Sequence, residues 1–332
     1  MLLLESFSLY LIFESELDSF RALSLLIFGK SSQSMKRPNN LEKGDLIYIV
    51  SPAKKIDPDS IYFAKKLIES WGLRSKCAEH ALGAYNYFSD NDANRAFDFQ
   101  SAIDHEEAKA ILCARGGYGC IRIVDQLNWD NFQRSPKWLI GFSDITVMHH
   151  RAQRLSIMSL HATMPLNFKT NSKQAIESLR AALMGESFTI SSPPNVLNRM
   201  GTAHGRIVGG NLSIIYSLLG TNDAYDFEGA ILFIEDLSEQ LYHLDRMFFA
   251  LKKAGVFDKI TALVVGGMTE LKDTSSSFGM TYEDIILEKV KDSNFPICFN
   301  FPTGHIVDNR AMIIGADARI SVGPKGANLF YV

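Results

Sequence analysis

Short apolar runs alternate with helix-like stretches from residue 44 onward. The run DLIYIVSP predicts a strand, and Asp59 to Trp71 carries apolar residues at the i, i+3 and i+4 spacing of one helix face. Arg74 to Cys77 predicts a short strand, and Asn91 to Ile103 a second helix with cap candidates in the preceding SDND. Further strands are predicted at AKAILCA, KWLIGF and IMSLHA. A helix that ends at Gln126 is predicted after AKAILCA, and a helix that starts at Asp144 is predicted after KWLIGF. This alternation is typical of a mostly parallel sheet covered by helices on both faces.

The pattern changes between Met164 and His204, where SSPPNVLNRMGTAHG combines consecutive prolines with turn formers and predicts a linker or crossover. Beyond it, HGRIVGGNLSIIYSLLGT predicts a glycine turn leading into a helix, and LYHLDRMFFALKKAG an amphipathic helix that ends at Gly255. One more helix is predicted over Tyr282 to Val290. Strands are predicted at GAILFIED, ITALVVGG and FPICFNFPTGH, and a closing hairpin at AMIIGADARISV. We therefore expect an α/β protein whose N-terminal domain holds a mostly parallel sheet and whose C-terminal α/β domain is rich in strands.

The expected domains are 35–165, 204–332 and a linker over 166–203, with residues 1–34 as an extension. The extension is apolar but lacks a basic n-region, and acidic residues interrupt every apolar stretch before it reaches the roughly 20 residues of a membrane span. Met35 opens the well-patterned part of the chain. We interpret the extension as a disordered segment, an accessory amphipathic helix or a start-site artefact, with a degenerate export signal as the alternative.

Composition excludes several classes of protein. The net charge is −3, with 46% hydrophobic and 21% charged residues, which is typical of a soluble globular chain. Basic residues are dispersed, so neither a nucleic-acid nor a membrane partner is expected. No Cys pair has C-x-x-C spacing and no H-E-x-x-H motif occurs, which favours free thiols in a reducing compartment and neither metal nor cofactor. The four cysteines are Cys77, Cys113, Cys120 and Cys298.

The heptapeptide IGFSDIT places Ser143 between an apolar strand and a new helix. Serine nucleophiles of α/β enzymes occupy such strand-to-helix turns, where the helix N-terminus supplies amides for an oxyanion. The second glycine of G-x-S-x-G is missing, and serine is also a common helix N-cap. The heptapeptide alone leaves both interpretations open.

The loop ARGGYG also follows a predicted strand, and its glycines free the backbone to turn amides toward an anion. It matches neither a P-loop nor G-x-G-x-x-G. It is therefore either a tight turn or, at the end of a neighbouring strand, the source of a second oxyanion amide.

A serine nucleophile requires a base and a residue that orients the base. His305 in FPTGH lies just past an apolar strand, whereas His149, His150 and His243 occupy helical positions typical of surface or packing residues. Glu235 ends the apolar run GAILFIE, and a carboxylate there is costly unless it is partnered. Capping of the next helix by Glu235 or Asp236 is the alternative.

Six segments together resemble the LD-carboxypeptidases, a family that includes muramoyltetrapeptide carboxypeptidases and microcin-immunity peptidases. They occur in the family's order from about Gly44 to the C-terminus: GDLIYIVSP, RAFDFQSAIDHEEAKAILCARGGYG, IGFSDIT, GRIVGGNLSIIYSLLGT, LFIEDLSEQLYHLDRMF and FPTGH. The resemblance implies a two-domain serine peptidase with Ser143 as nucleophile, Glu235 as orienter and His305 as base. It implies oxyanion amides from Asp144 and Gly117, with Gly116 as the close alternative to Gly117.

The same resemblance implies a murein peptide substrate, release of its terminal D-alanine, cytoplasmic recycling of cell-wall peptides and a homodimer. We expect Arg115, Gly116, Tyr118 and His161 to contact the substrate. Arg115 either pairs with a substrate carboxylate or forms a structural salt bridge. Many family members carry His-Gly-Pro-Met where this chain reads HATM from His161, which leaves the pocket geometry open there. Two other functions are considered: a microcin-immunity-like amide hydrolase acting on peptide-nucleotide toxins, and a non-catalytic murein-peptide-binding protein.

Overall fold

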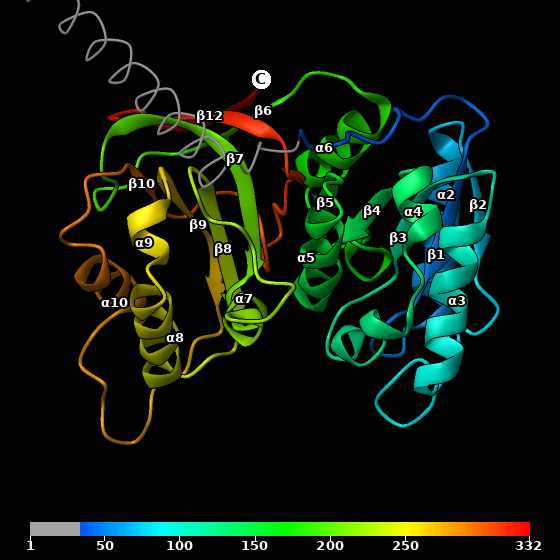
Figure 1. The fold of residues 1–332 in the computed structure, drawn as a ribbon, viewed down its shortest axis with the longest axis horizontal. Coiled ribbons are helices and arrows are strands. Elements are labelled where there is room, and N and C mark those ends of the chain that lie inside the picture. Colours follow the sequence, from blue (N-terminus) through cyan, green and yellow to red (C-terminus); the bar gives the residue numbers. More distant parts are fainter. Residues whose placement is uncertain (1–33) are drawn as a thin grey trace, which may run out of the picture. The chain divides into compact units, whose positions relative to one another are not determined.

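The computed structural model describes residues 34–332, so the interpretations of the N-terminal extension lie outside the described range. The first half of this range and one strand from near the C-terminus, β11, build a six-stranded sheet in the order β11-β5-β4-β3-β1-β2 (Figure 1). Its first five strands in the sequence run parallel, and β11 pairs antiparallel with β5. The strands are β1 (Leu46–Val50), β2 (Arg74–Cys77), β3 (Ala108–Cys113), β4 (Trp138–Gly141), β5 (Ser159–His161) and β11 (Met312–Ile314).

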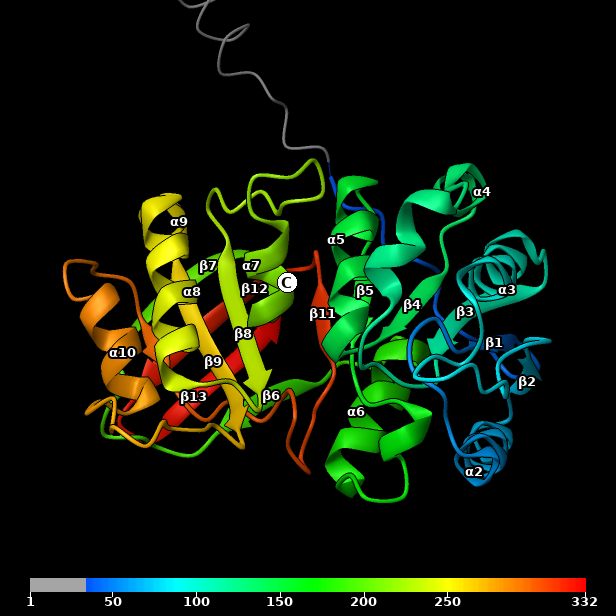
Figure 2. The same ribbon diagram turned by 90° about the horizontal axis from the view of Figure 1, so that it is seen from below.

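Helices cover both faces of this sheet, with α3, α4 and α5 on one face and α2 and α6 on the other (Figure 2). Strand β1 shows why: Tyr48 and Val50 join the core under α3 and α5, while Ile47 and Ile49 join the core under α2 and α6. A strand buried on both faces reads as a continuous apolar run. The helices are α2 (Pro58–Ser70), α3 (Asp92–Asp104), α4 (Asp130–Arg134), α5 (Thr146–Arg154) and α6 (Lys173–Met184), with short 3-10 turns at Cys120–Arg122, Val124–Gln126 and Pro165–Asn167.

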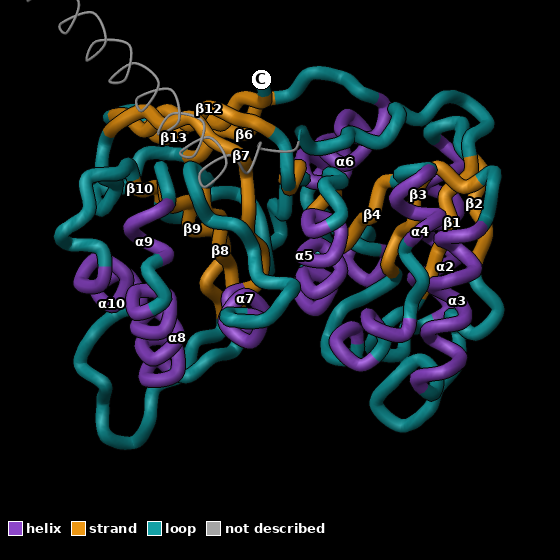
Figure 3. The backbone as a smooth tube through the Cα atoms, viewed as in Figure 1, coloured by secondary structure: helices purple, strands orange, loops and turns teal. Residues whose placement is uncertain are grey.

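The second half builds a seven-stranded sheet in the order β10-β9-β8-β7-β12-β13-β6. Strands β7 to β10 are parallel, and the remaining pairings are antiparallel. Figure 3 draws these strands in orange. Strand β7 joins the parallel part of the sheet to the antiparallel part, since its first half pairs with β12 and its second half pairs with β8. The strands are β6 (Thr189–Ser192), β7 (Gly201–Asn211), β8 (Ile231–Leu237), β9 (Ala262–Thr269), β10 (Ile297–Cys298), β12 (Asp317–Gly323) and β13 (Gly326–Tyr331).

Four helices pack on the parallel part: α7 (Leu212–Leu218), α8 (Leu241–Lys253), α9 (Val256–Lys259) and α10 (Tyr282–Lys289). Helices α5 and α7 lie next to each other where the two sheets meet (Figures 1 and 2). There the Asn211 amide donates to the Thr146 hydroxyl at 3.1 Å. None of the helices in the described range is long and apolar enough to cross a membrane.

The predicted α/β fold class is confirmed, and three local predictions are wrong. The glycine turn predicted after His204 is part of strand β7, where Gly209 is needed because a Cβ there would lie 1.8 Å from the Phe233 carbonyl oxygen. The helix predicted up to Gln126 consists of two 3-10 turns. The closing hairpin is formed by β12 and β13, because the chain turns at Gly315 and leaves β11 in the other sheet. The segment 166–203 contains α6 and β6.

Candidate active site

Ser143 follows strand β4 and begins a 3-10 turn, Ser143–Ile145, that leads directly into α5. Its φ of 65° lies in the left-handed region, which is rare and strained for a residue with a side chain. Gly141 makes room for the turn, because a Cβ there would lie 2.8 Å from the Ile145 side chain. A strained serine on a sharp strand-to-helix turn is the geometry of a nucleophile elbow.

The N-cap interpretation of Ser143 is not supported by the hydrogen bonding. The caps of the 3-10 turn and of α5 are Phe142 and Ile145, and neither end has a side-chain cap. Residues 144–150 are all buried, whereas Ser143 is partly exposed. Its hydroxyl forms no hydrogen bond with another residue in the described range.

The glycine loop lies directly against Ser143. A Cβ on Gly116 would lie 2.9 Å from the Ser143 Cβ and 3.1 Å from its Oγ, so only glycine allows this approach. Gly117 has a φ of 115°, and neither glycine amide donates a hydrogen bond to the part of the chain that the structure describes. These two expected oxyanion donors are unpaired beside the serine.

The Asp144 carboxylate ties the glycine loop to the serine turn. It is buried, and its Oδ2 accepts a hydrogen bond from the Cys120 amide at 2.9 Å. Burial raises the pKa of Asp144, and the Cys120 amide opposes that shift by stabilising the charged form. The side chain thus has a structural role, in addition to the oxyanion role expected for its backbone amide.

Glu235 lies near the end of β8 and is fully buried. Its Oε2 lies 2.5 Å from His305 Nδ1 and accepts a second hydrogen bond from the His305 amide at 3.2 Å. Burial opposes ionisation of Glu235, but the charge and hydrogen bond of His305, together with the nearby His161 ring, outweigh it and lower its pKa. Burial also favours neutral His305, but the Glu235 carboxylate outweighs it and raises the His305 pKa.

Backbone geometry explains how His305 reaches this carboxylate. Gly304 has a φ of 97°, and a Cβ there would lie 2.6 Å from the Glu235 Cβ. The Gly304 amide donates to the Asn309 side chain at 2.8 Å, which stabilises the loop. The His305 ring packs on Phe142 with ring centroids 4.8 Å apart. Because Phe142 immediately precedes Ser143, this contact brings the expected base and nucleophile to the same place.

His161 faces the carboxylate oxygen of Glu235 that His305 does not bind. Its Nε2 is 3.7 Å from Glu235 Oε1, and neither atom has a hydrogen-bond partner in the described range. The ring is fully buried and packs edge-on against Phe142 and Phe233. The His161 side chain has no exposed surface in this structure, and its expected contact with the substrate stays a prediction.

Two expected substrate contacts lie beside the glycine loop. Arg115 is half-buried and donates from Nη1 to the Lys55 carbonyl at 3.0 Å, while its Nε is buried without a partner. Tyr118 is 46% exposed and packs on Phe88 with centroids 6.1 Å apart. Sequence reasoning missed Lys54, which also lies against this loop. The sequence signal for Lys54 is weaker than that for Ser143, because Ser51, Pro52 and Ala53 stand between Lys54 and the end of β1.

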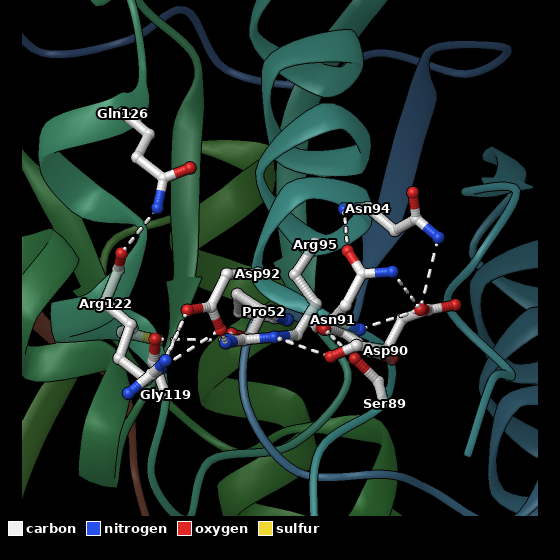
Figure 4. A network of polar contacts seen from close by, with 12 residues as sticks. Pro52, Ser89, Asp90, Asn91, Asp92, Asn94, Arg95, Gly119, Arg122 and Gln126 are labelled. Atoms are coloured by element: carbon white, nitrogen blue, oxygen red, sulfur yellow. Dashed lines mark hydrogen bonds and ion pairs between the residues drawn. The ribbon is translucent and has the colours of Figure 1, made fainter. Parts of the chain in front are cut away.

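A buried arginine missed in the sequence holds the other end of the glycine loop (Figure 4). Arg95 is 1% exposed and donates to the carbonyls of Pro52 and Gly119 and, through Nε, of Asp90. It also forms an ion pair with Asp92, which binds Arg122 as well (Figure 4). This network connects the loops after β1 and β3, and so helps position the expected oxyanion amides.

Metal ligands do not gather at this site: no group of three or more His, Cys, Asp or Glu residues suited to a metal ion occurs within residues 34–332. All four cysteines are free, and three of them are buried. The chemistry available at the site is that of a serine hydroxyl, a histidine, a carboxylate and backbone amides.

Comparisons with known proteins match both halves of the chain. Models of the LD-carboxypeptidase N-terminal and C-terminal domains match residues 47–162 and 204–320. The matches define a peptidase. The chain belongs to the LD-carboxypeptidase family.

Curated relatives carry carboxypeptidase names. A putative carboxypeptidase of Synechocystis sp. is 29% identical over 86% of this chain and 94% of its own length. A probable murein peptide carboxypeptidase of Bacillus subtilis is 29% identical over 88% of this chain and 93% of its own. The murein tetrapeptide carboxypeptidase of Pseudomonas aeruginosa is 26% identical over 82% and 92%.

Solved structures share the fold. The muramoyltetrapeptide carboxypeptidase of Oxalobacter formigenes superposes with a TM-score of 0.79 at 23% identity, covering 86% of this chain and 98% of that chain. The microcin C7 self-immunity protein in complex with glutamyl sulfamoyl guanosine superposes with a TM-score of 0.78 at 18% identity, covering 88% and 97%. The fold is therefore common to both branches and does not separate them.

Proposed function

We propose that this protein is a serine carboxypeptidase that cleaves the L,D-peptide bond of murein tetrapeptides and releases the terminal D-alanine. Ser143 is the nucleophile, His305 the general base and Glu235 the residue that orients the base. The observation that carries the proposal is the buried 2.5 Å contact between His305 and Glu235, packed through Phe142 against the turn of Ser143. The carboxypeptidase names of the relatives support the substrate class.

Acylation begins when His305 Nε2 accepts the proton of the Ser143 hydroxyl as Oγ attacks the scissile carbonyl carbon. Glu235 binds His305 at Nδ1, which leaves Nε2 free for the serine and stabilises the imidazolium that forms. His305 then returns the proton to the amine of the departing D-alanine. In the second half of the cycle His305 deprotonates a water molecule, which hydrolyses the acyl-enzyme.

The developing oxyanion is held by backbone amides. The Asp144 amide follows the nucleophile at the start of the turn, and the Gly117 amide is the second donor, with Gly116 as the alternative. The unpaired glycine amides and their contact with Ser143 support this assignment. Loss of one such donor typically costs about 100- to 1000-fold in kcat.

Incubation with a synthetic L-Ala-D-Glu-diaminopimelate-D-Ala tetrapeptide tests the proposal, with free D-alanine measured by mass spectrometry. We expect release by the wild type and none above background by Ser143→Ala, with circular dichroism and thermal melting showing that both variants are folded. Absence of release from folded wild-type protein contradicts the proposal. Binding of the tetrapeptide without turnover would instead identify a murein-peptide-binding protein.

An acyl-sulfamoyl nucleotide assayed beside the tetrapeptide separates the microcin-immunity alternative. The fold likeness to the self-immunity protein motivates this second substrate. Hydrolysis of the nucleotide conjugate with no action on the tetrapeptide would assign the protein to that branch.

By resemblance to the family, we further propose that the reaction serves recycling of murein peptides in the cytoplasm and that the protein is a homodimer. Light scattering coupled to size-exclusion chromatography tests the oligomeric state, and a molar mass equal to that of one chain contradicts the dimer.

A further inference from the structure

Two cations lie at the same edge of the first sheet as Ser143. Lys54 follows β1, Arg115 follows β3 and Ser143 follows β4, and these three strands are neighbours in the order β4-β3-β1. The carboxyl ends of neighbouring parallel strands meet at one edge of a sheet, which is where ligands bind in open α/β folds. Lys54 and Arg115 therefore lie beside the proposed nucleophile.

The glycine loop lies between Lys54 and Ser143 and contacts both residues. A Cβ on Gly117 would lie 3.0 Å from the Lys54 Cβ, and a Cβ on Gly116 would lie 2.9 Å from the Ser143 Cβ. Two consecutive glycines are thus all that separates the lysine stem from the serine. The Lys54 ammonium lies 4.8 Å from the centroid of the Tyr87 ring, whose hydroxyl would be 3.1 Å from a Cβ on Gly117.

Neither cation has a carboxylate partner within residues 34–332. Arg122, Arg151 and Arg180, by contrast, each form ion pairs with acidic side chains. Among the described residues Arg115 donates only to the Lys55 carbonyl, and its Nε is buried there without an acceptor. Burial without an anion lowers the pKa of Arg115, because desolvation disfavours the charged form. An uncompensated, partly desolvated pair of cations is suited to an anionic ligand.

We infer that Lys54 and Arg115 bind the free α-carboxylate of the residue that the enzyme releases from the substrate's carboxyl terminus. This inference rests on the proposed carboxypeptidase function and names the group that directs it to chain ends. In the residue to be released, only the amide nitrogen and the α-carbon separate the scissile carbonyl carbon from the terminal carboxylate carbon. Charge-assisted hydrogen bonds to that carboxylate align the scissile bond with Ser143.

Lys54 and Arg115 also make the site specific for substrates that have a free terminal carboxylate. An internal peptide bond, a carboxamide or a nucleotide conjugate has no free carboxylate at this position and leaves both cations unpaired. Leaving a buried charged group unpaired costs more than the loss of a neutral contact. The site therefore favours a terminal carboxylate over the same peptide ending in an amide.

Binding to the Ser143→Ala protein tests this without turnover, using calorimetry with the tetrapeptide and with its C-terminal carboxamide. We expect the acid to bind about 10- to 100-fold more tightly than the amide, which is the range for hydrogen bonds to charged groups. Adding Lys54→Met or Arg115→Gln should weaken acid binding by a similar factor and leave amide binding nearly unchanged. Lys54→Arg should retain most of the preference.

Lys43→Met is the matched control, because Lys43 is exposed in the turn at the amino end of β1 and its loss changes the net charge equally. The control should bind both peptides as the Ser143→Ala parent does. Thermal melting of every variant reports folding. Equal binding of acid and amide by the parent, equal weakening of both by Lys54→Met, or binding of neither peptide would overturn the inference.

The experiments distinguish failure of the proposed carboxypeptidase function from failure of the proposed carboxylate site. A wild-type protein that binds the acid selectively through Lys54 but releases no D-alanine would retain the carboxylate site and lose the assignment as a peptidase of this bond. A wild-type protein that releases D-alanine and hydrolyses the carboxamide equally well would retain the peptidase and lose the carboxylate site.

Discussion

Nδ1 of His305 lies 2.5 Å from Oε2 of Glu235, although the two residues are 70 positions apart in the sequence. Glu235 comes from β8, and His305 comes from the loop that follows β10. The contact is possible because Gly304 lets the loop approach the Glu235 stem closely. It compensates a fully buried carboxylate and fixes which histidine nitrogen faces the serine.

The pH dependence of kcat/KM follows from this contact. His305 accepts a proton only when it is neutral, and Glu235 raises its pKa above the ordinary value of 6.5. The ascending limb of the profile should therefore lie above pH 6.5. In Glu235→Gln the raising charge is gone while burial remains, so the limb should move to lower pH. The maximal rate should fall by about 1000- to 10000-fold, as for loss of the orienting carboxylate in serine proteases.

Stopped assays of D-alanine release across about pH 5 to 9 measure the shift of the ascending limb between the wild type and Glu235→Gln. A Glu235→Gln limb that stays in place or moves to higher pH would contradict the assignment of His305 and Glu235 as a coupled pair.

His161 should position Glu235 without touching the substrate. In His161→Phe the ring still packs between Phe142 and Phe233, but nothing faces Glu235 Oε1. We expect kcat to fall about 10-fold with KM little changed, since a misoriented carboxylate affects the proton transfer and not binding. His161→Gln retains an N–H donor and should recover part of the rate. A change confined to KM would place His161 in the substrate pocket instead.

Gly116→Ala should reduce activity without unfolding the protein. The added methyl group would lie 2.9 Å from the Ser143 Cβ and 3.2 Å from the Phe142 carbonyl oxygen, so the serine must shift. A displacement of this kind costs on the order of 100-fold in kcat/KM. Gly323→Ala is the control, because a Cβ there meets no atom within 4 Å. Equal activity of the two variants would show that the glycine loop does not position the serine.

Arg95→Met should destabilise the fold and loosen the glycine loop. Removal of the guanidinium leaves the carbonyls of Pro52 and Asp90 without this donor, while Arg122 still binds Asp92 and the Gly119 carbonyl. A buried acceptor left unsatisfied costs about 1 to 3 kcal/mol in the free energy of unfolding. Arg74→Met is the control, since its ion pair with Glu107 is exposed on both sides and should change stability far less. Urea denaturation measures both, and equal losses would contradict a special role for Arg95.

Local sequence features predicted the fold class and singled out the candidate site residues. Strand β1 is a continuous apolar run because helices cover both its faces, and α8 ends near Gly255 because its amphipathic spacing ends there. Ser143, Glu235 and His305 stand out because polar residues that end apolar strands need partners or a function. These features depend on neighbours within a few positions and are readable from one chain.

Long-range pairing was not readable in the same way. Strand β11 belongs to the first sheet although β12 follows it closely and belongs to the second, because Gly315 turns the chain between them. The glycines of β7 suggested a turn, yet Gly209 is required by the approach of the neighbouring strand β8. Sheet register and the close packing of distant segments determine which strands pair, and local periodicity does not predict either of them.

The sequence by itself determined which chemical groups the site contains: a serine at a strand-to-helix turn, a histidine, a carboxylate and a flexible glycine loop. Only the tertiary structure decided how they face one another. It placed His161 next to Glu235, set Lys54 beside Ser143 across two glycines, and gave Arg115 no carboxylate partner among the described residues. The physical reason is that residue type is a local property of the chain, whereas burial, distance and unpaired charge arise only when the two sheets pack together.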